Sequence, residues 1–499
     1  MPGGVVLPHS ALCVVNDRLS LVDQACSGSC PFSSSLQQDP PHDGDDPIFF
    51  LHVLRHTPGI APPAANATDL FDALDTIAVT LRGETDDLGF LREFFGPESV
   101  FWDAKEHLFG VTSTRRERFF DCVWPRIVDI ALNLPNLFPS GHAPTLVSVE
   151  KIHLTRQQTA CLVAHQFLCT LPRAGGKAYE ELDSMDLHIW FSRDQPHPYA
   201  VQAYLTALIV FLERTVMEED VDRDTTFTLT GPFAPSDSTR NRSFCPVELD
   251  VRGHDAIVIS PQSVGLQYSA DVGASNACVI SANKHPGFGR TASQEEMHVG
   301  CSPASWVLKL VMPTSGLPDD QALVVEGCEL IVEMTGFSRS ARLSGISLSE
   351  NKWSSRTMLF MDALPFDAYD TTTSTAIIPD LLPGNVEREF KKACAAFNSA
   401  PYDQIITGHW GCGSFAGNKP VKAIIQWCAA SMSGIGRLKF ICWPGEDESF
   451  PDEFSGFIEL VANGGYTVAN LLDVLLKLRT DDEPARHKSH FVTQFDFLF

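Results

Sequence analysis

Two adjacent carboxylates follow a glycine-containing turn just past the middle of the chain. Residues 281–296 read Ser-Ala-Asn-Lys-His-Pro-Gly-Phe-Gly-Arg-Thr-Ala-Ser-Gln-Glu-Glu, which ends on Glu295 and Glu296. Backbone amides at Gly287–Gly289 can approach a diphosphate closely because little side chain blocks them. Paired carboxylates can supply the acid and the base for cleavage of a sugar bond. A plain turn followed by the solvated start of a helix fits the same letters, so both interpretations stay open.

A second glycine-rich loop lies nearer the C-terminus. Gly411, Gly413 and Gly417 surround Phe415, and a helix is predicted to start directly after the loop. Because ligands of α/β sheets bind at the carboxyl ends of strands, two such loops could form a cradle for a dinucleotide-like ligand. Two tight turns with a packed phenylalanine explain the same pattern.

The first half of the chain must position these loops with helices. Residues 1–65 are rich in Pro, Gly, Ser and Asp and are expected to be largely irregular. From 66 to 220, apolar residues recur at helical spacing, for example at 69–78, 119–134 and 199–218. Thr155 and a Gln three residues later predict a capped helix. His165, inside that helix, is expected to be a hydrogen-bonded core residue.

The second half has a different texture. Residues 221–245 look like a linker or an exposed loop, and short β-rich runs alternate with helical stretches after it. This alternation predicts an α/β sheet with helices on both faces, followed by a C-terminal tail at 481–499. The predicted strands are 256–260, 277–282, 306–312, 322–325, 330–334, 357–361, 404–407 and 438–443, and the predicted helices are 386–397, 419–431 and 468–478.

Composition excludes some classes of function. The chain has 499 residues, 44% of them hydrophobic, and a net charge of -25. An acidic protein of this kind lacks the basic footprint of a general nucleic-acid-binding surface.

The fourteen cysteines are scattered, which fits a reducing compartment. No signal peptide is evident, and the apolar run at 203–212 is too short to span a membrane. We find no metal-ligand spacing and expect neither a metal nor another cofactor.

The order of these motifs resembles the poly(ADP-ribose) glycohydrolases. Besides the Gln-Glu-Glu triplet and the Trp-Gly-Cys-Gly-Ser-Phe loop, the resemblance includes Leu-Pro-Asn-Leu at 134–137, the segment 154–172 and Met-Asp-Ala-Leu-Pro-Phe at 361–366. It implies an α/β macrodomain, a mixed sheet flanked by helices, at 246–480. It also implies a helical accessory domain at 66–220.

The resemblance also implies a reaction. The substrate would be poly(ADP-ribose), attached to modified proteins and cut at its ribose–ribose O-glycosidic bonds. The acidic composition favours cleavage mainly from the terminus, because it offers no long basic track for a polyanion. We expect a monomer, nuclear or cytoplasmic, that does not bind a membrane.

Site residues carry over one by one from the resemblance. Glu296 takes the position of the catalytic acid and base, and Glu295 that of a ribose contact. The remaining predicted substrate contacts are Asn283 and Gln294 beside the ribose; Gly287, Phe288 and Gly289 at the diphosphate; Gly413, Ser414 and Phe415 in the second loop; Asp271 at the adenine amino group; Trp443 or Phe457 stacked on the adenine; and Phe337, where the family commonly has a tyrosine.

Some positions depart from the family pattern. Gly-Phe-Gly stands in place of a triple glycine, the segment between Asn283 and Gln294 is shorter than usual, and Ile280 replaces an aspartate. Two other functions therefore remain open. One is a non-catalytic macrodomain that only binds ADP-ribose, and the other is a hydrolase of mono-ADP-ribosyl bonds or free nucleotides. The retained pair of glutamates favours catalysis, since a reader has little use for a carboxylate beside a diphosphate.

Overall fold

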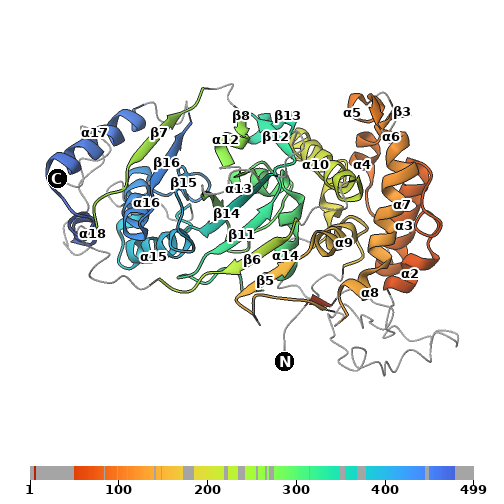
Figure 1. The fold of residues 1–499 in the computed structure, drawn as a ribbon, viewed down its shortest axis with the longest axis horizontal. Coiled ribbons are helices and arrows are strands. Elements are labelled where there is room, and N and C mark those ends of the chain that lie inside the picture. The colour runs from red at the N-terminus through yellow and green to blue at the C-terminus, as the bar shows by residue number, and fades with distance from the viewer. Residues whose placement is uncertain are drawn as a thin grey trace. The chain divides into compact units, whose positions relative to one another are not determined.

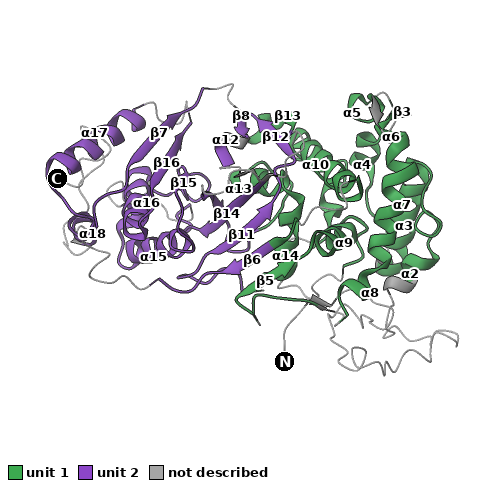
Figure 2. Ribbon diagram, viewed as in Figure 1, with its two compact units in different colours: residues 1–225, 287–313, 337–346 green, residues 226–286, 314–336, 347–499 purple. Residues whose placement is uncertain are grey.

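The chain forms two compact units in the computed structural model (Figure 2). Unit 1 contains residues 1–225, 287–313 and 337–346, and unit 2 contains residues 226–286, 314–336 and 347–499. Segment 287–313, which carries both predicted catalytic carboxylates, therefore groups with the N-terminal helices. The structure describes residues 5–6, 50–83, 85–97, 99–108, 111–139, 142–147, 149–171, 185–217, 223–233, 242–253, 257–264, 267–268, 275–313, 315–347, 354–367, 378–443 and 449–477.

Unit 1 is mainly helical (Figure 1). Its helices are α2 (Phe50–His56), α3 (Ala67–Arg82), α4 (Gly89–Phe94), α5 (Val100–Asp103), α6 (Arg115–Arg118), η2 (Phe119–Val123), α7 (Trp124–Leu132), α8 (Leu134–Leu137), α9 (Arg156–Phe167), η4 (Leu187–Trp190), α10 (Pro198–Met217), α13 (Gln294–Gly300), η5 (Pro303–Val307), α14 (Leu308–Val311) and η6 (Ser338–Ser340). Its strands are β1 (Val5–Val6), β2 (Lys105–Leu108), β3 (Val111–Thr114), β4 (His142–Ala143), β5 (Lys151–Leu154) and β13 (Arg342–Ile346).

Two predictions about the helices of unit 1 are confirmed. Thr155 caps α9 in a capping box with Gln158. His165 is fully buried, with Nδ1 2.7 Å from the Thr170 hydroxyl and Nε2 3.1 Å from the Ala131 carbonyl oxygen. Helix α10 is longer than the apolar run in the sequence, and its length and composition would suffice to cross a membrane. However, 78% of the most apolar 18-residue stretch of this helix is buried, as in the central helix of a protein core.

Unit 2 is built on a mixed sheet. Its strands are β6 (Thr225–Leu229), β7 (Val247–Val251), β8 (Ile257–Ile259), β9 (Gln267–Tyr268), β10 (Asn276–Ala282), β11 (Leu323–Cys328), β12 (Val332–Thr335), β14 (Ser354–Asp362), β15 (Gln404–Thr407) and β16 (Arg437–Cys442). Along the main sheet the order is β6-β11-β14-β10-β15-β16-β7. Strand β11 is antiparallel to both of its neighbours here, whereas all pairs from β14 to β7 are parallel. The predicted mixed α/β sheet is confirmed.

Parallel pairing gathers the strand ends that matter. Ala282 of β10 pairs with Asp362 of β14, and Thr407 of β15 pairs with Phe440 of β16. The loops that follow these four strands consequently leave the same edge of the sheet.

Helices cover the sheet and close a hydrophobic core. They are α12 (Pro261–Val264), η7 (Pro379–Leu381), α15 (Asn385–Phe397), α16 (Lys419–Ser433), α17 (Phe450–Asn463) and α18 (Val468–Lys477). Buried side chains of α15–α18 form one core cluster with those of strands β10, β14, β15 and β16. Asn418 caps α16, and Gly434 ends it in the left-handed conformation that glycine adopts without strain.

Several predictions about elements are wrong. Residues 306–312 are predicted as a strand, but residues 306–311 belong to η5 and α14. A short, mostly buried apolar run has no periodicity that separates a strand from a helix. The predicted loop at 221–245 contains β6, which pairs with β11. Helices α2 and α17 and strand β7 were not predicted.

Candidate functional site

The two carboxylates lie in the first turn of α13. Ser293 is the N-cap: its Oγ accepts the N–H of Glu296 at 3.2 Å, and Oε2 of Glu296 accepts the N–H of Ser293 at 3.1 Å. This capping box follows from the letters Ser-x-x-Glu and stabilises the start of the helix. The positive end of the helix dipole also favours negative side chains in this turn, which suits both Glu295 and Glu296.

Glu296 is held from a second direction by Thr291. The N–H of Thr291 donates to Oε1 at 3.3 Å, and the hydroxyl of Thr291 donates to Oε2. The side chain of Glu296 is only partly buried. It thus combines fixed geometry with access to solvent, as a general acid and base needs.

Glu295 is more deeply placed. Its side chain is buried, and Oε1 accepts the N–H of Gly287 at 2.8 Å. The glycine loop therefore uses one of its amides to hold a carboxylate. That amide was expected to face a diphosphate, and here it positions Glu295 instead.

Phe288 points into unit 1. It is 2% exposed, with ring centroids 5.3 Å from Trp190 and 6.1 Å from Trp306, and the Nζ of Lys309 lies 4.5 Å from its centroid. With this ring buried, only the backbone of Phe288 is left for the predicted contact with a diphosphate, which stays a prediction. This phenylalanine instead anchors the glycine loop in the apolar core.

Both glycines of this loop are closely packed against side chains. A Cβ at Gly287 would overlap the side chain of Lys309, and a Cβ at Gly289 would overlap the carboxylate of Glu296. Neither residue has a positive φ. Close packing, and not an unusual backbone angle, thus explains glycine at both positions.

Unit 2 contributes a separate group of predicted contacts at the carboxyl edge of its sheet. Asn283 directly follows β10, is exposed, and accepts the N–H of His285 on its Oδ1 at 3.0 Å. Partial burial, together with the nearby Lys284 ammonium, lowers the pKa of His285. Trp443 directly follows β16 at the same edge and is partly exposed. Asn283 and Trp443 are placed where ligands of α/β sheets bind.

The second glycine loop follows β15 and is tied down on both sides. Trp410 Nε1 donates to the Met361 carbonyl at 2.9 Å, and the Phe415 carbonyl accepts the N–H of Phe366 at 2.9 Å. Gly411 has φ 70°, where a side chain would be strained. Gly413 and Ser414 are exposed and Phe415 is half-buried. The loop therefore presents its tip to solvent while its base is fixed.

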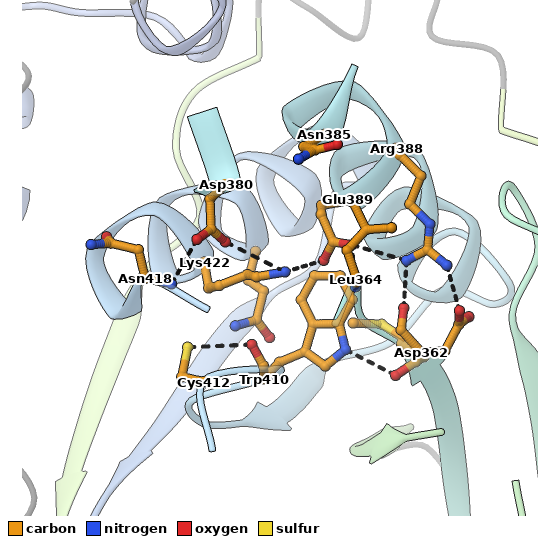
Figure 3. A network of polar contacts seen from close by, with 12 residues as sticks. Asp362, Leu364, Asp380, Asn385, Arg388, Glu389, Trp410, Cys412, Asn418 and Lys422 are labelled. Carbon is orange, nitrogen blue, oxygen red and sulfur yellow. Dashed lines mark hydrogen bonds and ion pairs between the residues drawn. The ribbon is translucent and has the colours of Figure 1, made fainter. Parts of the chain in front are cut away.

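A buried charge network lies beneath this loop (Figure 3). Lys422 of α16 forms an ion pair with Glu389 of α15, lies 3.7 Å from Asp380, and has its Nζ 4.6 Å from the centroid of the Trp410 ring. The side chains of Lys422, Glu389 and Asp380 are at most 1% exposed. Asp380 also accepts the N–H of Asn418, at the start of α16, at 2.8 Å. The network thus joins two helices to the base of the loop.

The same network continues to the end of β14. Arg388 pairs with both Asp362 and Glu389 (Figure 3). Lys392 Nζ lies 2.7 Å from Asp362 Oδ1. Burial lowers the pKa of Lys392 and raises the pKa of Asp380. Three acids and three bases balance one another in a place where a lone charge would be costly.

The remaining predicted contacts have different surroundings. Phe457 is 4% exposed and belongs to the core cluster, with its ring centroid 6.4 Å from that of Trp427. Its ring therefore has no free face for a base, and the stacking prediction rests on Trp443. Phe337 is 56% exposed at the start of η6. Gln294 is half-buried at the start of α13. Asp271 lies outside the described residues.

Sequence reasoning missed Thr291 and Lys422. Capping letters could have found Ser293, but they do not record the bond of Thr291 to Glu296 five residues later, and the contacts of Lys422 are tertiary. Within the ranges that the structure describes, no group of three or more His, Cys, Asp and Glu side chains is arranged to hold a metal ion.

Comparison with protein families finds two matches within the chain. The model of the poly(ADP-ribose) glycohydrolase macro domain fold matches residues 262–448, and the model of that family's helical domain matches residues 111–228. Two curated relatives are from Caenorhabditis elegans. Poly(ADP-ribose) glycohydrolase 1 is 30% identical over 184 residues (34% of this chain, 23% of the relative), and poly(ADP-ribose) glycohydrolase 2 is 29% identical over 167 residues (30% and 34%). The aligned part thus spans about a quarter to a third of these relatives.

Solved structures with some likeness include two bacterial proteins. Poly(ADP-ribose) glycohydrolase from Deinococcus radiodurans in complex with ADP-ribose is 15% identical, covering 48% of this chain and 95% of that one, with a TM-score of 0.28. The enzyme from Thermomonospora curvata is also 15% identical, covering 45% and 82%, with a TM-score of 0.28. Scores this low do not support an argument about the fold. The two family models do, and by their matches the chain belongs to the poly(ADP-ribose) glycohydrolase family, with its helical domain and its macro domain fold.

Proposed function

We propose that this protein hydrolyses the ribose–ribose O-glycosidic bonds of poly(ADP-ribose), mainly from the terminus, and releases ADP-ribose. Membership of the family and the names of the curated relatives support this function. The observation that carries it is the pair Glu295 and Glu296 at a capped helix start, each held by an amide of the preceding loop. A protein that only bound ADP-ribose would have no need to fix two carboxylates in this way.

Glu296 is the general acid and base of the proposed reaction. Its carboxyl proton goes to the oxygen of the leaving ribose hydroxyl as the bond from the ribose carbon breaks and positive charge grows on that carbon. The carboxylate then takes a proton from a water molecule whose oxygen bonds to the same carbon. Glu295 accepts a hydrogen bond from a ribose hydroxyl and so orients the reacting sugar.

The carboxyl edge of the sheet in unit 2 is the proposed holder of the ADP-ribose unit. Asn283, the tip Gly413–Phe415 and Trp443 follow three neighbouring parallel strands, which supports this assignment. Poly(ADP-ribosyl)ated proteins are the proposed partners of a monomeric enzyme. The cysteines in the described ranges form no disulfide, which supports a nuclear or cytoplasmic location.

The decisive experiment compares two substrates. The protein is incubated with purified poly(ADP-ribose) and, separately, with a mono-ADP-ribosylated protein, and free ADP-ribose is measured by chromatography. We expect release from the polymer only, and a rate of release about 10²- to 10⁴-fold lower with Glu296→Gln. Binding of ADP-ribose without any release would instead identify a reader, and release from the mono-ADP-ribosylated protein a different hydrolase.

A further inference from the structure

Two aromatic side chains from the helical segment hold the loop 287–291 by its backbone. The indole Nε1 of Trp190, the last residue of η4, donates to the Gly289 carbonyl at 2.6 Å. The hydroxyl of Tyr204, in α10, donates to the Thr291 carbonyl at 3.0 Å. Both side chains are fully buried, so water does not compete for these hydrogen bonds.

The same loop donates its N–H groups to the catalytic candidates. Gly287 donates to Glu295 and Thr291 donates to Glu296. The Thr291 residue is thus fixed through its carbonyl by Tyr204 and fixes Glu296 through its N–H and hydroxyl. Any shift of the loop would therefore move the donors of both carboxylates.

Tyr204 also contacts the helix that carries the carboxylates. A Cβ at Gly300 of α13 would overlap the Tyr204 ring, so a residue without a side chain is needed for this packing. The ring centroid of Trp190 lies 5.5 Å from that of Tyr204 and 5.3 Å from that of Phe288. Burial, and then the nearby Glu296 carboxylate, raises the pKa of Tyr204 well above its ordinary value. Its hydroxyl consequently remains a donor throughout the physiological pH range.

We propose that Trp190 and Tyr204 are positioning residues, which set the geometry of Glu295 and Glu296 by holding the loop 287–291. The helical segment would then contribute to the rate of the reaction and not only to stability. This inference rests on the proposed function for its effect on rate, whereas its effect on the loop can be measured without any activity.

The test removes one hydrogen bond at a time. Trp190→Phe and Tyr204→Phe keep an aromatic ring and lose the donor. Trp124→Phe is the matched control, because the buried indole of Trp124 donates in the same way to the Gly59 carbonyl, at 3.1 Å, away from the loop. The readouts are kcat and KM on poly(ADP-ribose), and hydrogen–deuterium exchange of peptides covering residues 287–296.

We expect each of the two loop variants to lower kcat by about 10- to 100-fold with little change in KM, since a displacement of about 1 Å at a catalytic group costs this much. Amide exchange over 287–296 should become faster in both variants and stay unchanged in Trp124→Phe. If Trp190→Phe fails to fold, Tyr204→Phe, which removes a single oxygen, decides the question.

Unchanged exchange over 287–296, or a loss of kcat no larger than in Trp124→Phe, would overturn the inference. Failure of the unmodified protein to release ADP-ribose would overturn the proposed function instead. The exchange measurement would then still decide whether Trp190 and Tyr204 hold the loop.

Discussion

Glu296 combines two tasks in one side chain. Its carboxylate completes the capping box with Ser293 and is also the proposed acid and base. A glutamine can serve in the same capping box, because its amide oxygen accepts the same N–H. Glu296→Gln therefore removes the acid and keeps the cap, and loses only the longer bond from the Thr291 N–H.

The first prediction concerns this substitution. Glu296→Gln should lower kcat on poly(ADP-ribose) by about 10²- to 10⁴-fold, which is the rate enhancement that a general acid and base typically contributes. The variant should retain ADP-ribose binding. Turnover and calorimetric affinity measure the two effects. Glu295→Gln should also lower the rate, through loss of ribose positioning. The loop should keep its structure in this variant, because the amide oxygen of the glutamine can still accept the Gly287 N–H. If Glu295→Gln is dead while Glu296→Gln keeps more than about a tenth of the activity, the two roles are reversed.

A second prediction at the same scale concerns Gly289. A methyl group in Gly289→Ala would overlap the Glu296 carboxylate, so we expect kcat to fall by about 10-fold or more and ADP-ribose affinity to weaken as the loop shifts. Gly253→Ala is the control, since nothing lies within 4 Å of a Cβ there. Steady-state kinetics and calorimetry check both effects. Wild-type rate and affinity in a folded Gly289→Ala protein would contradict the packing described for this loop.

At the scale of elements, the charge network holds α15, α16 and the second glycine loop together. Lys422→Met leaves buried Asp380 without its cation and leaves buried Glu389 with Arg388 alone. Breaking such a pair costs about 3–5 kcal/mol, so the free energy of unfolding in urea should fall by that amount.

The matched control for Lys422→Met is Arg437→Met. Arg437 pairs with Glu248 at 2.7 Å, but the two side chains are 55% and 40% exposed. An exposed pair contributes below about 1 kcal/mol, so this variant should unfold nearly as the unmodified protein does. Equal losses in the two variants would show that the buried network does not stabilise unit 2.

At the scale of the whole molecule, acid should weaken the fold through His165. Burial lowers the pKa of His165 to about 4, from 6.5 in the unfolded chain. Between these values the unfolded state binds the proton and the folded state does not, so the free energy of unfolding falls as pH drops from 6.5 to 4. The loss from this residue should be on the order of 3 kcal/mol.

The pH dependence can be assigned by substitution. His165→Gln cannot titrate, so the slope of unfolding free energy against pH between 4 and 6.5 should become shallower in this variant. Urea unfolding at several pH values measures that slope. An equal slope in both proteins would mean that other groups cause the acid sensitivity.

Net charge also predicts the products. With a charge of -25, the protein has little to attract a long polyanion along its surface, so binding should concentrate on one terminal ADP-ribose. We expect free monomer to dominate from the earliest times, with mono-ADP-ribosylated protein left behind. Gel analysis of a time course measures this distribution, and early accumulation of long free oligomers would contradict it.

The sequence by itself determined the features that depend on neighbouring residues. The Thr155 cap of α9 and strand β15 at 404–407 are where the letters predict them, because capping and strand periodicity act over a few residues. The order of the two glycine loops and the Gln-Glu-Glu triplet was likewise sufficient to predict the family. An apolar run without periodicity, as at 306–312, was not sufficient even for the type of element.

Only the tertiary structure decided how the candidate catalytic segment is held. Phe288 points into the core. The hydrogen bonds from Trp190 and Tyr204 to the loop join residues that lie 99 and 87 positions apart in the chain. Lys422 and Glu389 are likewise 33 positions apart. Such contacts form because the packed core brings distant side chains together and removes the water that would otherwise satisfy them, and no local pattern of residues records which partners will meet.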